Sequence, residues 1–164
     1  MFTNLHTFLA IAKEAWATAE GVLQAHQRPK PDGSPGFILS LDPEQRSFKN
    51  SLVAIVFAGV YLEALLHIEG TKALGAKYND FWKYEEKLEK LGAAAGLIEA
   101  GRHFREARNA VMHEKASERG HLRIAQQEAR QAIAFVEQVA AWLGAPPQGV
   151  QRTPPNTHCT RRRL

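Results

Sequence analysis

Residues 51–68 form an almost entirely apolar run, which is interrupted mainly by Glu63 and His67. A run of this length reaches the threshold for a membrane span. We prefer a central helix that is buried on most of its sides, because Glu63 places a carboxylate in mid-run and no strongly basic flank marks a membrane edge. The run therefore predicts an all-α bundle built around this helix, with no membrane contact.

Helical periodicity dominates the rest of the chain, and no persuasive strand alternation appears. The pattern predicts five helices, which run from about Phe2 to Ala25, from Asp42 to about Ala73, from Phe81 to Leu91, from Ala94 to Glu114, and from Leu122 to Leu143. Between the first two, residues 28–41 contain three prolines and two glycines, a composition that ends a helix and indicates a loop.

Two helix starts carry recognisable capping residues. Asp42 suits the N-cap of the second helix, and Pro43 suits its first helical position. Asn79 or Asp80 can cap the third helix. The inward-facing positions of that third helix are expected to be Phe81, Tyr84, Leu88 and Leu91.

A chain of 164 residues has the length of one domain with one hydrophobic core. We expect that domain over residues 1–143, with an N-terminal helix in 1–27 and a loop in 28–41. Cys159 is the only cysteine, so no intramolecular disulfide can form, and a reducing, cytoplasmic setting is the default. Residues 1–23 are amphipathic and do not have the pattern of a signal peptide.

The net charge of +4 comes entirely from the C-terminal tail. Residues 144–164 contain Arg152 and Arg161–Arg163 and no acidic residue, so residues 1–143 are neutral overall. The tail could contact RNA or an acidic surface, but we favour a solvated, disordered end. Charge therefore does not identify the helical body as a nucleic-acid-binding surface.

Arg108 lies inside the apolar stripe of the fourth helix. In an ideal helix it falls about 40° from Phe104, within the arc that the apolar residues occupy. A guanidinium there needs a carboxylate, a phosphate or a partner surface, since burying it unpaired is costly. Burial makes Glu63, in the apolar second helix, a candidate partner for Arg108. Asn109 follows directly, and His113, whose proton moves near neutral pH, follows five residues after Arg108.

Two stretches resemble the HEPN superfamily (higher eukaryotes and prokaryotes nucleotide-binding), whose members are small four-helix domains. Residues 54–66, which contain Leu-Glu-Ala, resemble the long core helix of the family, and residues 104–114 resemble its Arg-polar-x(3–5)-His signature. The likeness spans about residues 48–143. It implies an up-and-down bundle of four to five helices, to which the N-terminal helix and loop are additions.

For catalytic members, the resemblance implies metal-independent RNA cleavage in a cleft between two protomers. Arg108 would hold the scissile phosphate, His113 would be general acid or base for attack by the ribose 2′-hydroxyl, and Asn109 would orient the site. An ideal helix separates Arg108 and His113 by about 140°. Either the helix loosens near Met112 or a homodimer shares the site, and the resemblance favours the second.

The same resemblance leaves a second function open. The chain would be an endoribonuclease in a toxin or defence setting, with RNA and an antitoxin as partners, or a non-catalytic module that binds a nucleotide or a protein. The sequence His113-Glu114-Lys115 lacks the His-x-Tyr extension of members that are regulated on a tyrosine. No cofactor is expected, because zinc-binding His-Glu-x-x-His and Cys-x-x-Cys motifs, Gly-x-Gly-x-x-Gly and the P-loop are all absent.

The composition of the tail generates a first prediction. Residues 144–164 contain four prolines, little apolar surface and all the excess charge. Deleting them should leave the Tm nearly unchanged in a thermal melt, and should weaken any RNA binding at low salt. A large fall in Tm would show that the tail packs on the helical body.

Overall fold

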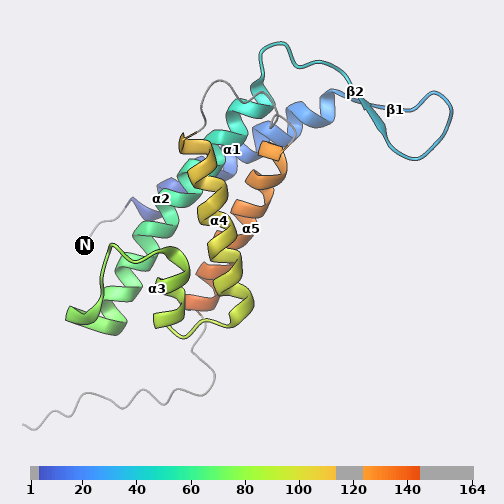
Figure 1. The fold of residues 1–164 in the computed structure, drawn as a ribbon. Coiled ribbons are helices and arrows are strands. Elements are labelled where there is room, and N and C mark those ends of the chain that lie inside the picture. The colour runs from blue at the N-terminus through green and yellow to red at the C-terminus, as the bar shows by residue number, and fades with distance from the viewer. Residues whose placement is uncertain (1–3, 114–123, 145–164) are drawn as a thin grey trace, which may run out of the picture.

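The computed structural model describes residues 4–113 and 124–144, and its architecture is the expected all-α helical bundle (Figure 1). The expected boundaries at Phe2, Glu114 and Leu122, and nearly all of the tail, lie outside the described residues. The helices are α1 (Leu5–Ala25), α2 (Arg46–Leu74), α3 (Tyr84–Lys90), α4 (Ala95–His113) and α5 (Ile124–Gly144), with a 3-10 turn η1 (Gly75–Lys77) after α2.

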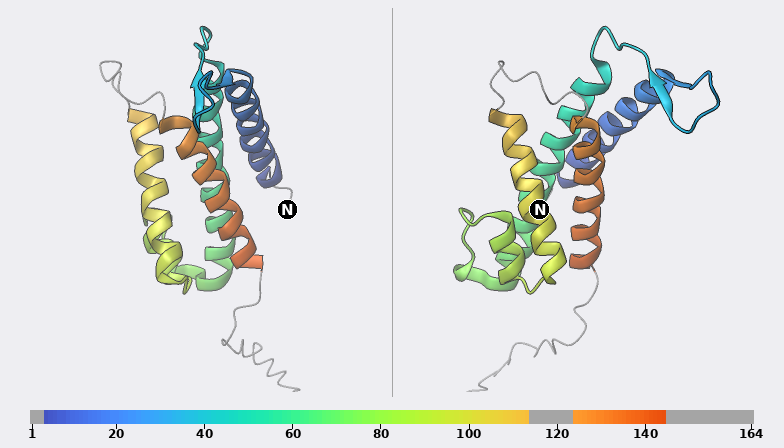
Figure 2. Two further views of the ribbon diagram at one scale, coloured as in Figure 1. Left: turned by 90° about the vertical axis from the view of Figure 1, so that its right-hand side faces the viewer. Right: turned by 45° about the vertical axis from the view of Figure 1, so that its right-hand side comes forward.

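The four long helices alternate in direction, and the short α3 lies at one end of the bundle between α2 and α4 (Figures 1 and 2). α2 is central, because it contacts α1, α4 and α5. Ile55, Leu62 and Leu66 of α2 are fully buried and share one core with Leu88 of α3 and Val136 of α5. The apolar run thus forms the core helix that its composition predicts.

The segment Arg46–Lys77 is also the one described helical segment that is long and apolar enough to cross a membrane. Its best window has a mean hydropathy of 2.0, and half of that window is buried inside the bundle. The core helix of a soluble protein meets the same criterion.

The start of α2 differs from the expected one. The helix begins at Arg46 with Gln45 as N-cap, three residues later than expected, because the backbone N–H of Gln45 donates to the carbonyl of Asp42 and closes a turn first. Asp42 still satisfies the first helical turn, since its Oδ2 accepts the backbone N–H of Ser47 at 2.9 Å. The hydroxyl of Ser47 then donates to the carbonyl of Ala19 at 3.0 Å and joins α2 to α1.

Residues 28–41 are not only a loop. They contribute to an antiparallel hairpin of β1 (Gln27–Pro29) and β2 (Phe37–Leu39), in the register Gln27–Leu39, Arg28–Ile38 and Pro29–Phe37. Strands of three residues are too short for an alternating pattern to be recognised in the sequence. The hairpin projects from the bundle beyond the C-terminal end of α1 (Figure 2).

The third helix is shorter than expected, and one inward-facing assignment was wrong. α3 starts at Tyr84 with Lys83 as N-cap, whose backbone N–H donates to Glu86 Oε2 at 3.0 Å. Asn79 instead accepts the backbone N–H of Phe81 at 3.0 Å and forms a turn before the helix. That turn moves Phe81 out of helical phase, so its ring is 96% exposed. Tyr84 and Leu88 are buried as expected.

Candidate functional site

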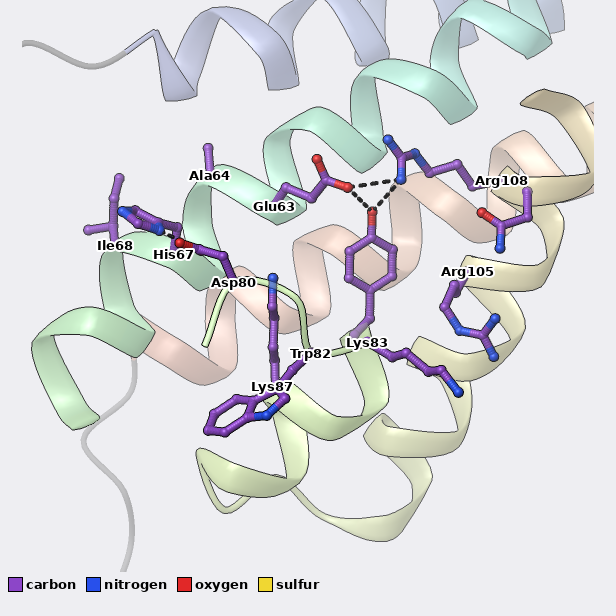
Figure 3. A pocket seen from close by; sticks show the side chains of 12 residues that line it. Glu63, Ala64, His67, Ile68, Asp80, Trp82, Lys83, Lys87, Arg105 and Arg108 are labelled. Carbon is purple, nitrogen blue, oxygen red and sulfur yellow. Dashed lines mark hydrogen bonds and ion pairs between the residues drawn. The ribbon is translucent and has the colours of Figure 1, made fainter. Parts of the chain in front are cut away.

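Arg108 is held by two side chains from two other helices. Its Nη1 donates to Glu63 Oε1 of α2 at 2.9 Å and to the hydroxyl of Tyr84 of α3 at 3.0 Å. The Tyr84 hydroxyl in turn donates to Glu63 Oε1 at 2.9 Å, which closes a triangle (Figure 3). The pairing of Arg108 with Glu63, which the burial argument expected, is present, and Tyr84 is an additional partner.

Gly59 provides the space that the Arg108 side chain occupies. A Cβ added to Gly59 would lie 2.6 Å from Arg108 Nε and 2.7 Å from its Cδ, too close for any real side chain. Gly59 precedes Glu63 by one helical turn, so the two residues lie on the same face of α2. The Nε of Arg108 is buried there without a hydrogen-bond partner, and the Arg108 side chain as a whole is only 22% exposed.

Arg108 and Asn109 line a pocket of about 660 Å³ between α2, α3 and α4 (Figure 3). Its walls carry four basic side chains and two carboxylates, together with Trp82 and other neutral groups. The basic residues are Lys83, Lys87, Arg105 and Arg108, and the carboxylates are Glu63 and Asp80. The pocket is therefore locally cationic, although the helical body as a whole is neutral.

Burial changes the ionisation of two groups in this pocket. Desolvation, followed by the nearby charge of Glu63, raises the pKa of Tyr84 far above its usual value, so the phenol stays protonated and remains a donor to Glu63. Burial lowers the pKa of Lys87, although Asp80 and Glu63 oppose that effect. The charge of Arg105, in contrast, is balanced by a carboxylate, because its Nη2 forms an ion pair with Glu85 Oε1 at 2.9 Å.

A histidine that sequence reasoning did not select also lines the pocket. His67 Nδ1 donates to Asp80 Oδ1 at 2.7 Å, and this leaves Nε2 as the free ring nitrogen. His67 lies one turn after Glu63 on α2 and is on the same face. Both members of the pair are more than half exposed, so the pairing contributes little to stability.

The structure brings together some of the expected site residues. Arg108, Asn109 and Glu63 meet at one pocket. His113 is the last residue of α4 and follows Arg108 by five positions along that helix. Its side chain lies outside the described part of the structure. Within residues 4–113 and 124–144, no group of three or more His, Cys, Asp or Glu side chains is placed to hold a metal ion.

Two of the missed residues left signals in the sequence. A buried tyrosine requires a partner for its hydroxyl, so assigning Tyr84 to the core implied a polar contact there. Gly59 in the middle of a helix costs about 1 kcal/mol relative to alanine, which indicates a close packing neighbour. The proximity of Lys87 and of the His67–Asp80 pair to Arg108 had no comparable signal, because it depends on how α3 is placed.

Comparison with known proteins adds no relative: no family model, no curated protein and no solved structure matches this chain.

The contact between Gly59 and Arg108 generates a second prediction. Gly59→Ala should displace Arg108 from Glu63 and Tyr84 and lower the free energy of unfolding by about 1–3 kcal/mol, measured in urea. Gly21→Ala is the matched control, since no heavy atom lies within 4 Å of its added Cβ, and it should stabilise helix α1 by about 0.5–1 kcal/mol.

A double-mutant cycle identifies the cause. In an Arg108→Ala background, Gly59→Ala should lose most of its cost, because the clashing side chain is gone. An equal cost in both backgrounds would contradict the packing that we describe.

Proposed function

We propose that this protein is a metal-independent endoribonuclease of HEPN type that cleaves RNA by attack of a ribose 2′-hydroxyl. The observation that carries the proposal is the placement of Arg108 in the wall of a cationic pocket, with Asn109 beside it. Glu63 and Tyr84 occupy Nη1, whereas Nη2 has no hydrogen-bond partner among the described residues. An arginine fixed on one side and free on the other is suited to bind a phosphate.

In the proposed reaction, a base takes the proton of the 2′-hydroxyl, the 2′-oxygen forms a bond to phosphorus, and the bond to the 5′-oxygen breaks. The leaving 5′-oxygen takes a proton from an acid. Arg108 neutralises the charge that develops on the non-bridging oxygens, and Asn109 orients the phosphate. His113 supplies proton transfer, and a second protomer supplies the second histidine.

A second candidate function rests on the same contacts. Because Glu63 and Tyr84 satisfy part of the Arg108 guanidinium, the arginine also fits a structural role in a non-catalytic module that binds a nucleotide or a protein. The neutrality of residues 1–143 favours this alternative over an RNA-binding body. For either function we expect the cytoplasmic setting that the single cysteine implies. As an endoribonuclease, the protein would act in a toxin or defence setting, with an antitoxin as its protein partner.

The proposal requires two protomers, which generates a third prediction. A symmetric homodimer joined across the mouth of the pocket that Arg108 and Asn109 line would bring the two motifs together. Light scattering at micromolar concentration should then report about twice the 18.3 kDa of one chain. A monomer under these conditions would remove the shared-site mechanism.

The fourth prediction concerns cleavage. Wild-type protein incubated with total RNA and EDTA should yield fragments that end in 2′,3′-cyclic phosphate and 5′-hydroxyl, whereas DNA should resist. His113→Ala should reduce the rate by roughly 10²–10⁴. Arg108→Lys should also lose cleavage activity, because lysine cannot reproduce the planar, two-pronged hydrogen bonding of the guanidinium.

His103→Ala is the matched control for this assay. His103 lies on α4, is paired with Glu99 at 2.9 Å and does not line the pocket, so its loss should leave cleavage unchanged. If wild-type protein cuts nothing, or if His113→Ala cuts at the wild-type rate, the catalytic proposal is wrong. The binding module would then be the better interpretation.

A further inference from the structure

We propose that Lys87 forms a second phosphate subsite in this pocket, so that the RNA ligand spans two backbone phosphates, one at Arg108 and one at Lys87. The inference rests on the proposed function only in taking RNA as the ligand, and it concerns binding, not cleavage. No motif in the sequence pointed to Lys87, and the reaction described above does not use it.

Lys87 has an enclosed side chain and no counter-ion of its own. The residue as a whole is 5% exposed, and its ammonium group, which still reaches solvent, has no hydrogen bond or ion pair among the described residues. Its one polar contact is with the ring of Tyr78, whose centroid lies 5.6 Å from Nζ. Figure 3 shows the side chain extending from α3 into the pocket. A lysine stem is seldom this enclosed, and here only the charged end of the side chain is open to a ligand in the pocket.

Both carboxylates in the pocket are already engaged. Asp80 accepts from His67 at 2.7 Å, and Glu63 accepts from Arg108 and Tyr84, each at 2.9 Å. These carboxylates oppose the lowering of the Lys87 pKa by burial, but neither lies within ion-pair distance of its ammonium group. An anionic group from a ligand is therefore the partner that this position lacks.

The other basic side chains of the pocket are less suited to the role. Arg105 is neutralised by Glu85 at 2.9 Å, and Lys83 is exposed at the start of α3. Compared with Arg105 and Lys83, only Lys87 combines an enclosed side chain with the absence of a partner. A phosphate bound there would lose competing water, which strengthens its interaction with the ammonium group.

The two cations line one pocket from neighbouring helices, Lys87 from α3 and Arg108 from α4. Tyr84 and Lys87 are three residues apart on α3, so their side chains are neighbours, with about 5–6 Å between Cβ atoms. The Tyr84 hydroxyl accepts a hydrogen bond from Arg108 Nη1, so Tyr84 contacts the first cation and is a neighbour of the second on α3. A single strand that lies along this wall would present one phosphate to each cation.

The test compares two ligands that cannot be cleaved, a 2′-O-methyl uridine dinucleotide with one phosphate and the corresponding trinucleotide with two, by NMR titration of the full chain. Wild-type protein should bind the trinucleotide about tenfold or more tightly than the dinucleotide, as expected for one additional charged contact. Lys87→Met should abolish that preference and leave dinucleotide affinity unchanged. Lys87→Arg should restore it.

Lys90→Met is the matched control, because Lys90 lies on the same helix, is exposed and does not line the pocket. It should keep the trinucleotide preference. The Tm of Lys87→Met should be equal to or above that of wild type, since methionine removes a buried charge but keeps most of the packing. A structural lysine would give the opposite change in Tm.

Three outcomes would overturn the subsite: wild-type protein shows no trinucleotide preference, Lys87→Met retains it, or Lys87→Met weakens both ligands equally and lowers the Tm. If Lys87→Met does not fold, the Lys87 ammonium signal of ¹⁵N-lysine-labelled wild type decides. That signal should shift with the trinucleotide and not with the dinucleotide, and an unchanged signal counts against the proposal. Binding without cleavage would reject only the endoribonuclease.

Discussion

The hydrogen-bonded triangle of Glu63, Tyr84 and Arg108 is the contact on which the pocket depends. A guanidinium in an apolar stripe is costly unless charge and hydrogen bonds compensate, and here a carboxylate and a buried phenol do so. The three residues come from α2, α3 and α4, so the triangle fixes these helices relative to one another. The walls of the pocket are the surfaces that this arrangement leaves facing each other.

Small residues decide how closely the helices approach. Gly59 lets Arg108 lie directly against the backbone of α2, and Gly101 of α4 does the same for Leu88 of α3, whose Cδ1 would lie 2.7 Å from an added Cβ. The buried residues of α1 are all alanines, Ala12, Ala15 and Ala19. At Gly59 the polar site depends on the same kind of close contact, because Arg108 reaches Glu63 and Tyr84 across a residue that has no side chain.

Helical periodicity was sufficient to predict the bundle, because the long helices are amphipathic or wholly apolar over many turns. Periodicity did not predict the short strands and turns. The three-residue strands β1 and β2 were not recognised, and the turn at Asn79 rotated Phe81 out of the core. The distinction is physical: a long repeating pattern averages over local exceptions, whereas a short element depends on single hydrogen bonds.

The residues of the candidate site likewise fall into those that the sequence identified and those that it did not. A charged residue in an apolar stripe identified Arg108, and a carboxylate in an apolar run identified Glu63, since each is costly without the other. The contributions of Lys87 and the His67–Asp80 pair depend on where α3 docks. No property of an isolated segment contains that information, so these residues were found only in the folded chain.

The shortness of α3 has a consequence for the lifetime of the site. A helix of seven residues is not stable in isolation, so α3 persists through its packing, chiefly that of Tyr84 and Leu88. Local opening of α3 removes the Tyr84 hydroxyl from Arg108 and opens the wall that carries Lys87. Such an opening would not require α2 or α5 to unfold, so we expect the amide hydrogens of α3 to exchange faster than those of these long helices. A ligand that bridges α3 and α4 binds only the assembled form and slows this exchange.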